Sequence, residues 1–476
     1  MSLAKNSLLY VISTISVKAT SFLLLPFYSH LISPDEYGYV YVITAFVNFM
    51  SLFMTLSLHG ALARFFFDCE SEGEVKQLYS TIVLYIFCIS TFFALVLYTN
   101  SEKISDFLNL PIVYFKYGIF ISYISVYYPI ILSLLYSKQS AKIVSIASTI
   151  LGMLGVAIQL IMVLKMDDKS LALIQTLLIN AILSFSVFCW FSRRYLTIPI
   201  LKMNAFILYI KYSVSQFPSD MSVWLVQFSD RLFINKFIGA FDAGIYGMGS
   251  QLGQIPQILF HSVNRAYVPF SFLKYKENEN GNKRALDDIV RSNVMVVSIL
   301  TSLIAILIVM SNNLIALLAS QYAKVANVMP MVLIAIWIDC MRILFMHPLA
   351  YRVSFMKIKS MIWVLSAVLN IGLNFLLIPR FSIYGACFSL IVSYGLTCIL
   401  IVFFADKAIK IHYQKKNLTQ IIVLAILFSM TYFLGVSLWG FIIKVLLSII
   451  FIYVVIFKCN DVDLKKWQKI LFFKKN

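Results

Sequence analysis

The sequence has 476 residues, of which 61% are hydrophobic and 13% are charged, and its formal net charge is +18. A soluble globular chain is about 45–50% apolar and about 25% charged, and one water-soluble core of this length could not bury so much apolar surface. The composition excludes a soluble enzyme or binding domain. It predicts an all-α integral membrane protein, because a bilayer accepts apolar helices of about 20 residues each.

Taken in chain order, the apolar runs predict fourteen membrane-spanning helices separated by short polar breaks. The last two must be separated by the single turn Leu438-Trp439-Gly440, and the chain would have twelve spans without this pair. The predicted spans are residues 8–32, 38–60, 78–99, 112–136, 143–164, 171–191, 212–236, 243–270, 292–318, 326–350, 360–379, 383–405, 418–438 and 440–457.

Basic residues recur in short clusters between the apolar runs rather than in one patch, so the charge does not indicate a nucleic-acid partner. When the N-terminus is placed inside and the spans alternate, 27 Lys and Arg residues fall in inner segments and 7 in outer ones. Inner loops of membrane proteins are enriched in Lys and Arg. The pattern predicts that both termini and the loop 271–291 are cytoplasmic.

A short internal repeat links the two halves of the chain. Glu36-Tyr37-Gly38-Tyr39 is followed 206 positions later by Asp242-Ala243-Gly244-Ile245-Tyr246. Six spans per half is an even number, so the halves share one orientation, as in parallel repeats about an axis along the membrane normal. We therefore expect a six-helix bundle over 1–205, a second over 206–410, and a terminal hairpin with a basic tail over 411–476, with a central cavity between the two bundles.

Seven charged residues fall inside predicted spans, where each costs roughly 2.5–3.5 kcal/mol at a helix centre. They must form pairs or line a water-filled cavity. Asp339 and Arg342 lie three positions apart on one helix face and can pair, whereas the adjacent Asp230 and Arg231 cannot face each other. Lys444 lies near a helix end and is expected to snorkel. The seven residues are Lys18, Asp220, Asp230, Arg231, Arg265, Asp339 and Arg342.

No motif of an enzyme or of a metal site stands out. The sequence has no P-loop and no HExxH motif, and its seven cysteines include no CxxC pair. Outer loops are short, the longest polar one running from Thr99 to Pro111. We expect no catalytic residues, no metal and no enzymatic activity.

Three segments resemble the Wzx-type polysaccharide flippase family of the multidrug/oligosaccharidyl-lipid/polysaccharide exporter superfamily. The first is Leu25-Pro26-Phe27-Tyr28-Ser29-His30-Leu31-Ile32-Ser33-Pro34-Asp35-Glu36-Tyr37-Gly38. The second is Ser229-Asp230-Arg231-Leu232-Phe233-Ile234 with Ala243-Gly244-Ile245-Tyr246. The third is Leu369-Asn370-Ile371-Gly372-Leu373-Asn374-Phe375-Leu376-Leu377-Ile378-Pro379 with Tyr384-Gly385-Ala386. The loop Phe381-Ser382-Ile383-Tyr384-Gly385 departs slightly from the family's Phe-Gly-Ile-Tyr-Gly.

The resemblance implies a flippase of the bacterial cytoplasmic (inner) membrane. It would move an undecaprenyl-pyrophosphate-linked oligosaccharide from the inner to the outer leaflet, by alternating access, for O-antigen or capsule biosynthesis. The expected partners are the lipid-linked oligosaccharide and membrane lipids, with a polysaccharide polymerase and a chain-length regulator as candidate protein partners. No cofactor is expected, and coupling to a proton or sodium gradient is left open.

The anionic pyrophosphate assigns roles to the charged residues, because cations would lower the cost of burying it. Lys18, Arg265, Arg342 and Arg231 are the predicted substrate-binding residues. Asp220, Asp339 and Asp230 would balance the cavity charge or carry a coupling proton.

Three alternatives remain open at this point. A drug or cation exporter of the same superfamily would need an acidic cavity, whereas the cations here slightly outnumber the acids. A peptidoglycan-precursor flippase differs from the main hypothesis in its cargo alone. A membrane polysaccharide polymerase would need a large outer loop.

Overall fold

The computed structural model describes residues 20, 22–200, 203–282, 284–411, 413, 415–434 and 437–455. These residues form helices joined by short connections, and no strand occurs among them. The chain divides into two compact units, one comprising Met1–Gly247 with Asn374–Ile383 and the other Met248–Leu373 with Tyr384–Asn476. The fold class predicted from the composition is confirmed.

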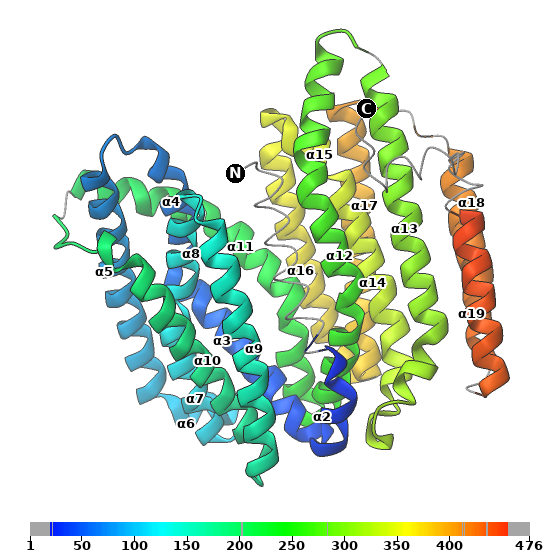
Figure 1. The fold of residues 1–476 in the computed structure, drawn as a ribbon, viewed down its shortest axis with the longest axis horizontal. Helices are drawn as coiled ribbons and strands as arrows, with labels where there is room; N and C mark the ends of the chain where they lie inside the picture. Colours follow the sequence, from blue (N-terminus) through cyan, green and yellow to red (C-terminus); the bar gives the residue numbers. More distant parts are fainter. Residues whose placement is uncertain are drawn as a thin grey trace. The chain divides into compact units, whose positions relative to one another are not determined.

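The first unit contains the helices of predicted spans two to seven and the end of span one (Figure 1). Its core forms where α3 packs on α7, α10 and α11, and where α4 packs on α8 and α11. The helices are α2 (Leu25–Leu31), α3 (Pro34–Thr55), α4 (Leu58–Phe65), α5 (Glu72–Thr99), α6 (Ser101–Phe107), α7 (Ile112–Ser125), α8 (Tyr127–Ser137), α9 (Ala141–Lys165), α10 (Lys169–Ser192) and α11 (Met203–Phe237).

The second unit contains the C-terminal helices, and α12 and α16 run from one unit into the other. Its helices are α12 (Ala240–Glu279), α13 (Arg284–Ile315), α14 (Val325–Phe345), α15 (His347–Tyr351), α16 (Met356–Phe381), α17 (Ile383–Ala408), α18 (Lys415–Ser429) and α19 (Leu438–Tyr453). Packing places the division inside α12, because α11 belongs with α3 and α4. The boundary near residue 205, which was inferred from the repeat, stays a prediction.

Nine described helical segments are long and apolar enough to cross a membrane, and they correspond to predicted spans two to six and nine to twelve. Predicted spans seven and eight are the continuous helices α11 and α12, of 35 and 40 residues. The terminal pair is shorter, with apolar helices at Thr419–Phe433 and Trp439–Tyr453. Most of predicted span one lies outside the described residues.

The start of α3 follows directly from local sequence. Ser33 caps the helix, since its side chain accepts from the Glu36 amide while the Glu36 carboxylate accepts from the Ser33 amide, and Pro34 occupies the first turn. A Ser-x-x-Glu capping box followed by proline is a recognised helix start. The predicted start at residue 38 was therefore late by one turn.

Predicted span two is not one helix. Leu56 and Ser57 both adopt left-handed backbone angles, with φ of 45° and 60°, and they separate α3 from α4. This conformation costs an L-residue other than glycine roughly 1–2 kcal/mol. Neither glycine nor proline marks the position, so the sequence carried no local signal for the break.

Two further predictions, both in the terminal hairpin, were wrong. Leu438 to Gly440 form the first turn of α19, which Ser437 caps, and not the turn between the last spans. α18 and α19 both pack against α13. The rings of Phe428 on α18 and Phe451 on α19 are stacked, with their centres 4.4 Å apart. Figure 1 shows the two helices side by side in orange and red. The Lys444 side chain does not snorkel: it is buried and its Nζ donates to Asn313 Oδ1 at 3.0 Å.

Candidate functional site

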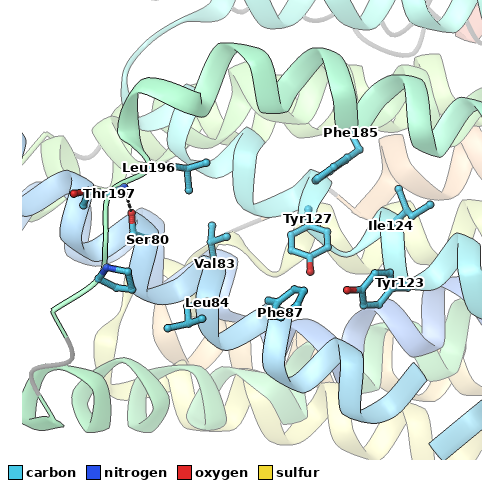
Figure 2. Close-up of a pocket in the computed structure, with 11 residues that line it drawn as sticks. Ser80, Val83, Leu84, Phe87, Tyr123, Ile124, Tyr127, Phe185, Leu196 and Thr197 are labelled. Atoms are coloured by element: carbon cyan, nitrogen blue, oxygen red, sulfur yellow. Dashed lines mark hydrogen bonds between the residues drawn. The ribbon is translucent and has the colours of Figure 1, made fainter. Parts of the chain in front are cut away.

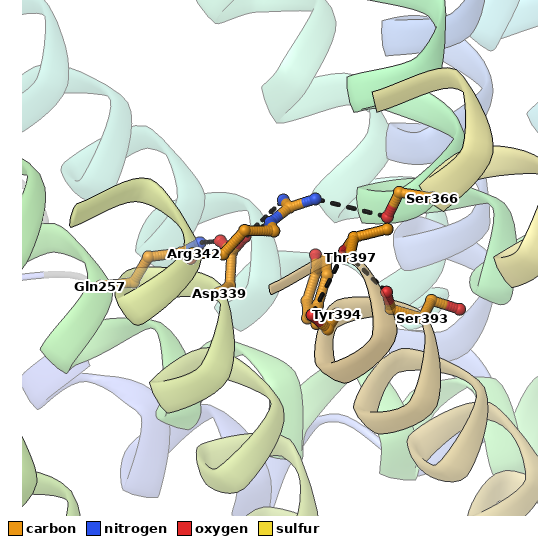
Figure 3. A network of polar contacts seen from close by, with 7 residues as sticks. All are labelled: Gln257, Asp339, Arg342, Ser366, Ser393, Tyr394 and Thr397. Carbon is orange, nitrogen blue, oxygen red and sulfur yellow. Dashed lines mark hydrogen bonds and ion pairs between the residues drawn. The ribbon is translucent and has the colours of Figure 1, made fainter. Parts of the chain in front are cut away.

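The predicted pair Asp339–Arg342 forms on α14 and is almost completely buried, each residue being 1% exposed. Arg342 donates to Asp339 Oδ1 through Nη2 at 2.5 Å and through Nε at 3.1 Å. Gln257 on α12 donates to the other carboxylate oxygen at 3.2 Å (Figure 3). The carboxylate and the guanidinium therefore neutralise each other within the second unit.

Neighbouring helices complete the surroundings of Arg342. Its Nη1 donates to Ser366 Oγ at 3.3 Å, and its guanidinium carbon lies 4.0 Å from the centre of the Trp363 ring and 4.7 Å from that of Tyr394. These contacts join α14 to α16 and α17 (Figure 3). Because Arg342 is 1% exposed and its N–H groups bind Asp339 and Ser366, this cluster acts as a packing contact in the present conformation.

Asp230 and Arg231 on α11 have separate partners, as their spacing predicts. Asp230 accepts hydrogen bonds from the Arg231 amide and from the Tyr246 hydroxyl. The Arg231 guanidinium carbon lies 3.7 Å from the centre of the Tyr41 ring and 4.6 Å from that of Phe228. Arg231 is 5% exposed, and its Nε has no hydrogen-bond acceptor. A cation held mainly by aromatic rings keeps hydrogen-bonding capacity for an anion.

Asp220, also on α11, meets the break between α3 and α4. The fully buried Ser57 donates to Asp220 Oδ2 at 2.6 Å, and Gln216 lies 3.5 Å from Oδ1. Charge-assisted bonds of this kind are about twice as strong as neutral ones. The bond helps to stabilise the left-handed backbone at Ser57.

Two predicted substrate-binding residues remain, Arg265 and Lys18, and the structure describes only Arg265. Arg265 on α12 has an exposed side chain, and no ion pair in the described part of the chain includes it. Lys18 lies outside the described residues. The structure thus brings Asp339 to Arg342 and Asp220 to Ser57, and leaves Arg231 and Arg265 without a carboxylate partner among the described ion pairs. The assignment of these residues to cargo binding remains a prediction.

The two copies of the repeated motif touch each other inside the first unit. A Cβ on Gly38 would overlap the carbonyl oxygen of Ala240, and a Cβ on Gly244 would overlap that of Pro34. Pro34 and Ala240, like Gly38 and Gly244, are 206 positions apart, so the contact maps onto itself when one repeat is exchanged for the other. A reciprocal contact of this kind is expected at a twofold axis. Only glycine allows the backbones of α3 and α12 to approach so closely.

The arrangement defines the class of protein: a multi-pass helical membrane protein with buried charges. Known structures agree. The chain is similar to the lipid II flippase MurJ in an inward closed conformation, with a TM-score of 0.73 and 15% identity over 98% of this chain and 100% of that one. It is also similar to an inward-facing multidrug resistance MATE family transporter of the MOP superfamily, with a TM-score of 0.66 and 8% identity over 86% and 94% of the chains.

Sequence comparison identifies the family. Residues 28–327 match the family described as "Polysaccharide biosynthesis protein", and the chain belongs to it. An uncharacterized membrane protein of Haemophilus influenzae is 25% identical over 283 residues, which cover 58% of this chain and 67% of that protein. The predicted relationship to a polysaccharide biosynthesis family is confirmed, and the fold is similar to that of MurJ and of a MATE transporter.

Proposed function

We propose that this protein moves an undecaprenyl-pyrophosphate-linked oligosaccharide from the inner to the outer leaflet of the bacterial cytoplasmic membrane. The observation that carries the proposal is membership of a polysaccharide biosynthesis family by a chain with a transporter fold. The protein is then a transporter and not an enzyme. The glycan would serve O-antigen or capsule biosynthesis.

The chemistry of the cargo fits the charges on the helices. The pyrophosphate and glycan are polar, whereas the polyprenyl tail can remain in the bilayer, so the transporter has to shelter only the head group. Arginines bind phosphate oxygens through paired N–H groups. Arg265 has an exposed side chain, whereas Arg231 and Arg342 are 5% and 1% exposed and would have to become accessible before they could bind the cargo.

Alternating access requires the two repeats to move against each other. The crossing of Gly38 and Gly244 brings the backbones of α3 and α12 together, and the Tyr41 ring of α3 lies against Gly247 close by. We infer that it serves as the pivot or closed gate of the transport cycle, with both termini of the chain in the cytoplasm.

Complementation of surface-glycan export in a bacterial strain that lacks its own flippase tests the proposal. Loss of a charge-assisted hydrogen bond costs about 1.5–3 kcal/mol, so Arg231→Gln and Arg265→Gln should each lower the export rate by roughly tenfold or more. Lys18→Gln tests a third predicted substrate-binding cation in the same export assay. Arg284→Gln, an exposed arginine at the start of α13, is the matched control.

Four outcomes would contradict parts of the proposal. Wild-type export by all three variants at normal membrane levels would overturn the cationic site. Efflux of a cationic dye without glycan export would indicate a drug exporter. Rescue of cells that lack their peptidoglycan-precursor flippase would change the cargo. Cysteine labelling that places residues 271–291 outside the cell would overturn the orientation.

A polymerase and a chain-length regulator remain proposed partners, testable by cross-linking in the same strain.

A further inference from the structure

A groove of about 460 Å³ lies in the first unit between α5, α7, α8 and α10 (Figure 2). Its walls are almost entirely apolar, with Val83, Leu84 and Phe87 on α5, Ile124 on α7 and Phe185 on α10. The volume lies within the range of about 300–1,000 Å³ found for ligand sites. A hydrocarbon chain suits this lining, because there are few polar groups to satisfy.

One wall is an extended segment that hydrogen bonds hold in place. The Thr197 amide donates to Ser80 Oγ at 2.8 Å, as Figure 2 shows. Gln77 accepts from the Ile200 amide at 2.8 Å and donates to the Ile198 carbonyl at 3.3 Å. Two side chains of α5 thus satisfy the backbone of a segment that belongs to no helix. The groove is a fixed feature of the fold rather than a gap beside a loose loop.

The same segment leaves apolar side chains exposed. Ile198 is 87% exposed, Ile200 is 65% exposed and Leu196 is 44% exposed. Full exposure of such a side chain to water forgoes about 1.5–3 kcal/mol of burial energy, and the three at alternate positions form an apolar patch. An apolar patch of this kind suits contact with hydrocarbon, and the positive-inside pattern predicts that this end of the helices faces the cytoplasm.

Basic side chains lie around Tyr195 and Trp190, just before this segment begins. Lys138 Nζ lies 5.0 Å from the centre of the Tyr195 ring, the Arg194 guanidinium lies 5.8 Å from it, and the Arg193 guanidinium lies 3.3 Å from that of Trp190. None of the ion pairs in the described ranges includes these three residues. Tyr195 directly precedes the groove residue Leu196, and its carbonyl accepts from Ser80.

We propose that this groove binds an anionic phospholipid of the bilayer. One acyl chain occupies the groove, and Arg193, Arg194 and Lys138 bind the phosphate. Basic clusters at the inner membrane face attract anionic lipids, and arginine binds phosphate oxygens in pairs. The bound lipid joins α5 and α10 to the segment that leads from the first repeat into the second, so it steadies that connection. This site is independent of the cargo site proposed above.

Photo-crosslinking in nanodiscs tests the proposal with the full-length purified protein. The probe is phosphatidylglycerol with a diazirine on its acyl chain, compared with the same label on phosphatidylcholine. Adducts of phosphatidylglycerol should map to α5 and α10 and exceed those of phosphatidylcholine by roughly fivefold or more. Equal labelling by the two lipids would overturn the proposal.

Two variant pairs separate the chain site from the head-group site. Leu84→Trp fills the groove and should abolish the adducts on α5 and α10, whereas Leu95→Trp, an exposed position on the same helix, should not. Arg193→Gln with Arg194→Gln should remove the preference for phosphatidylglycerol, whereas Lys407→Gln, another cation beside an aromatic ring, should keep it. Unchanged labelling of the Leu84 or arginine variants would overturn the site. Displacement by an equal amount of polyprenyl pyrophosphate would assign the groove to the cargo and overturn the phospholipid.

Discussion

Two buried arginines in this protein are stabilised in different ways. Arg342 is within one helical turn of Asp339, and its N–H groups bind that carboxylate and Ser366. Arg231 lies beside Asp230 in sequence, but Asp230 binds Tyr246 and the backbone, and the guanidinium rests on the Tyr41 and Phe228 rings. Spacing of three positions lets a helix neutralise its own charge, whereas adjacent residues point to different neighbours. The first charge is compensated locally, and the second depends on other segments.

The largest effect is expected from separating the compensated pair. Asp339→Asn leaves the Arg342 charge buried without a counter-charge and should destabilise the protein by about 3–5 kcal/mol, whereas Asp339→Leu combined with Arg342→Met should recover most of the loss. Thermal unfolding of the purified protein in detergent measures both.

Glycan export by the same variants separates the two roles of Arg342. Recovery of stability and export in the double variant would assign Arg342 to packing. Recovery of stability without export would assign it to the cargo. If Asp339→Asn alone lowered the stability by less than about 1 kcal/mol, this would contradict the conclusion that Asp339 compensates the charge of Arg342.

A smaller effect is expected where Arg231 rests on Tyr41. A Cβ on Gly247 would lie 2.8 Å from Cδ1 and Cγ of the Tyr41 ring, so Gly247→Ala should displace the ring from beneath the guanidinium and cost about 1–3 kcal/mol. Gly372→Ala is the matched control, because nothing lies within 4 Å of its Cβ and alanine favours a helix by about 1 kcal/mol. Thermal unfolding compares the two variants, and equal stabilisation of both would contradict the tight contact.

The smallest effect is expected at the break in span two. Ser57→Ala removes the bond to Asp220 and should cost about 1 kcal/mol, since Asp220 is only half-buried and can recruit water. Hydrogen exchange of the α3–α4 junction should increase with it. Ser122→Ala, a buried serine that bonds to the Gly118 carbonyl within α7, is the control. Unchanged exchange at the junction would show that other contacts hold the left-handed turn.

Features that depend on residues close together in the sequence were predicted correctly. The apolar runs located nine helices, and the Asp339–Arg342 spacing predicted its ion pair. The short motif predicted an internal repeat, but the contact between Gly38 and Gly244 could not be read from the motif. The break at Leu56 and Ser57 and the bond of Lys444 to Asn313 were missed, because Asp220 and Asn313 lie on distant segments.

The sequence by itself determined the membrane class, the helices and the charges that need compensation. These follow from hydrophobic length and from spacing along one helix, which are local quantities. Tertiary structure decided which charges are compensated, because the partners of Arg231, Asp220 and Lys444 come from other helices. It also decided where a groove opens beside Leu196 and Thr197, because α5, α7, α8 and α10 meet there only after packing. Contacts between distant segments depend on how helix faces fit together, and periodicity in one segment carries no information about that fit.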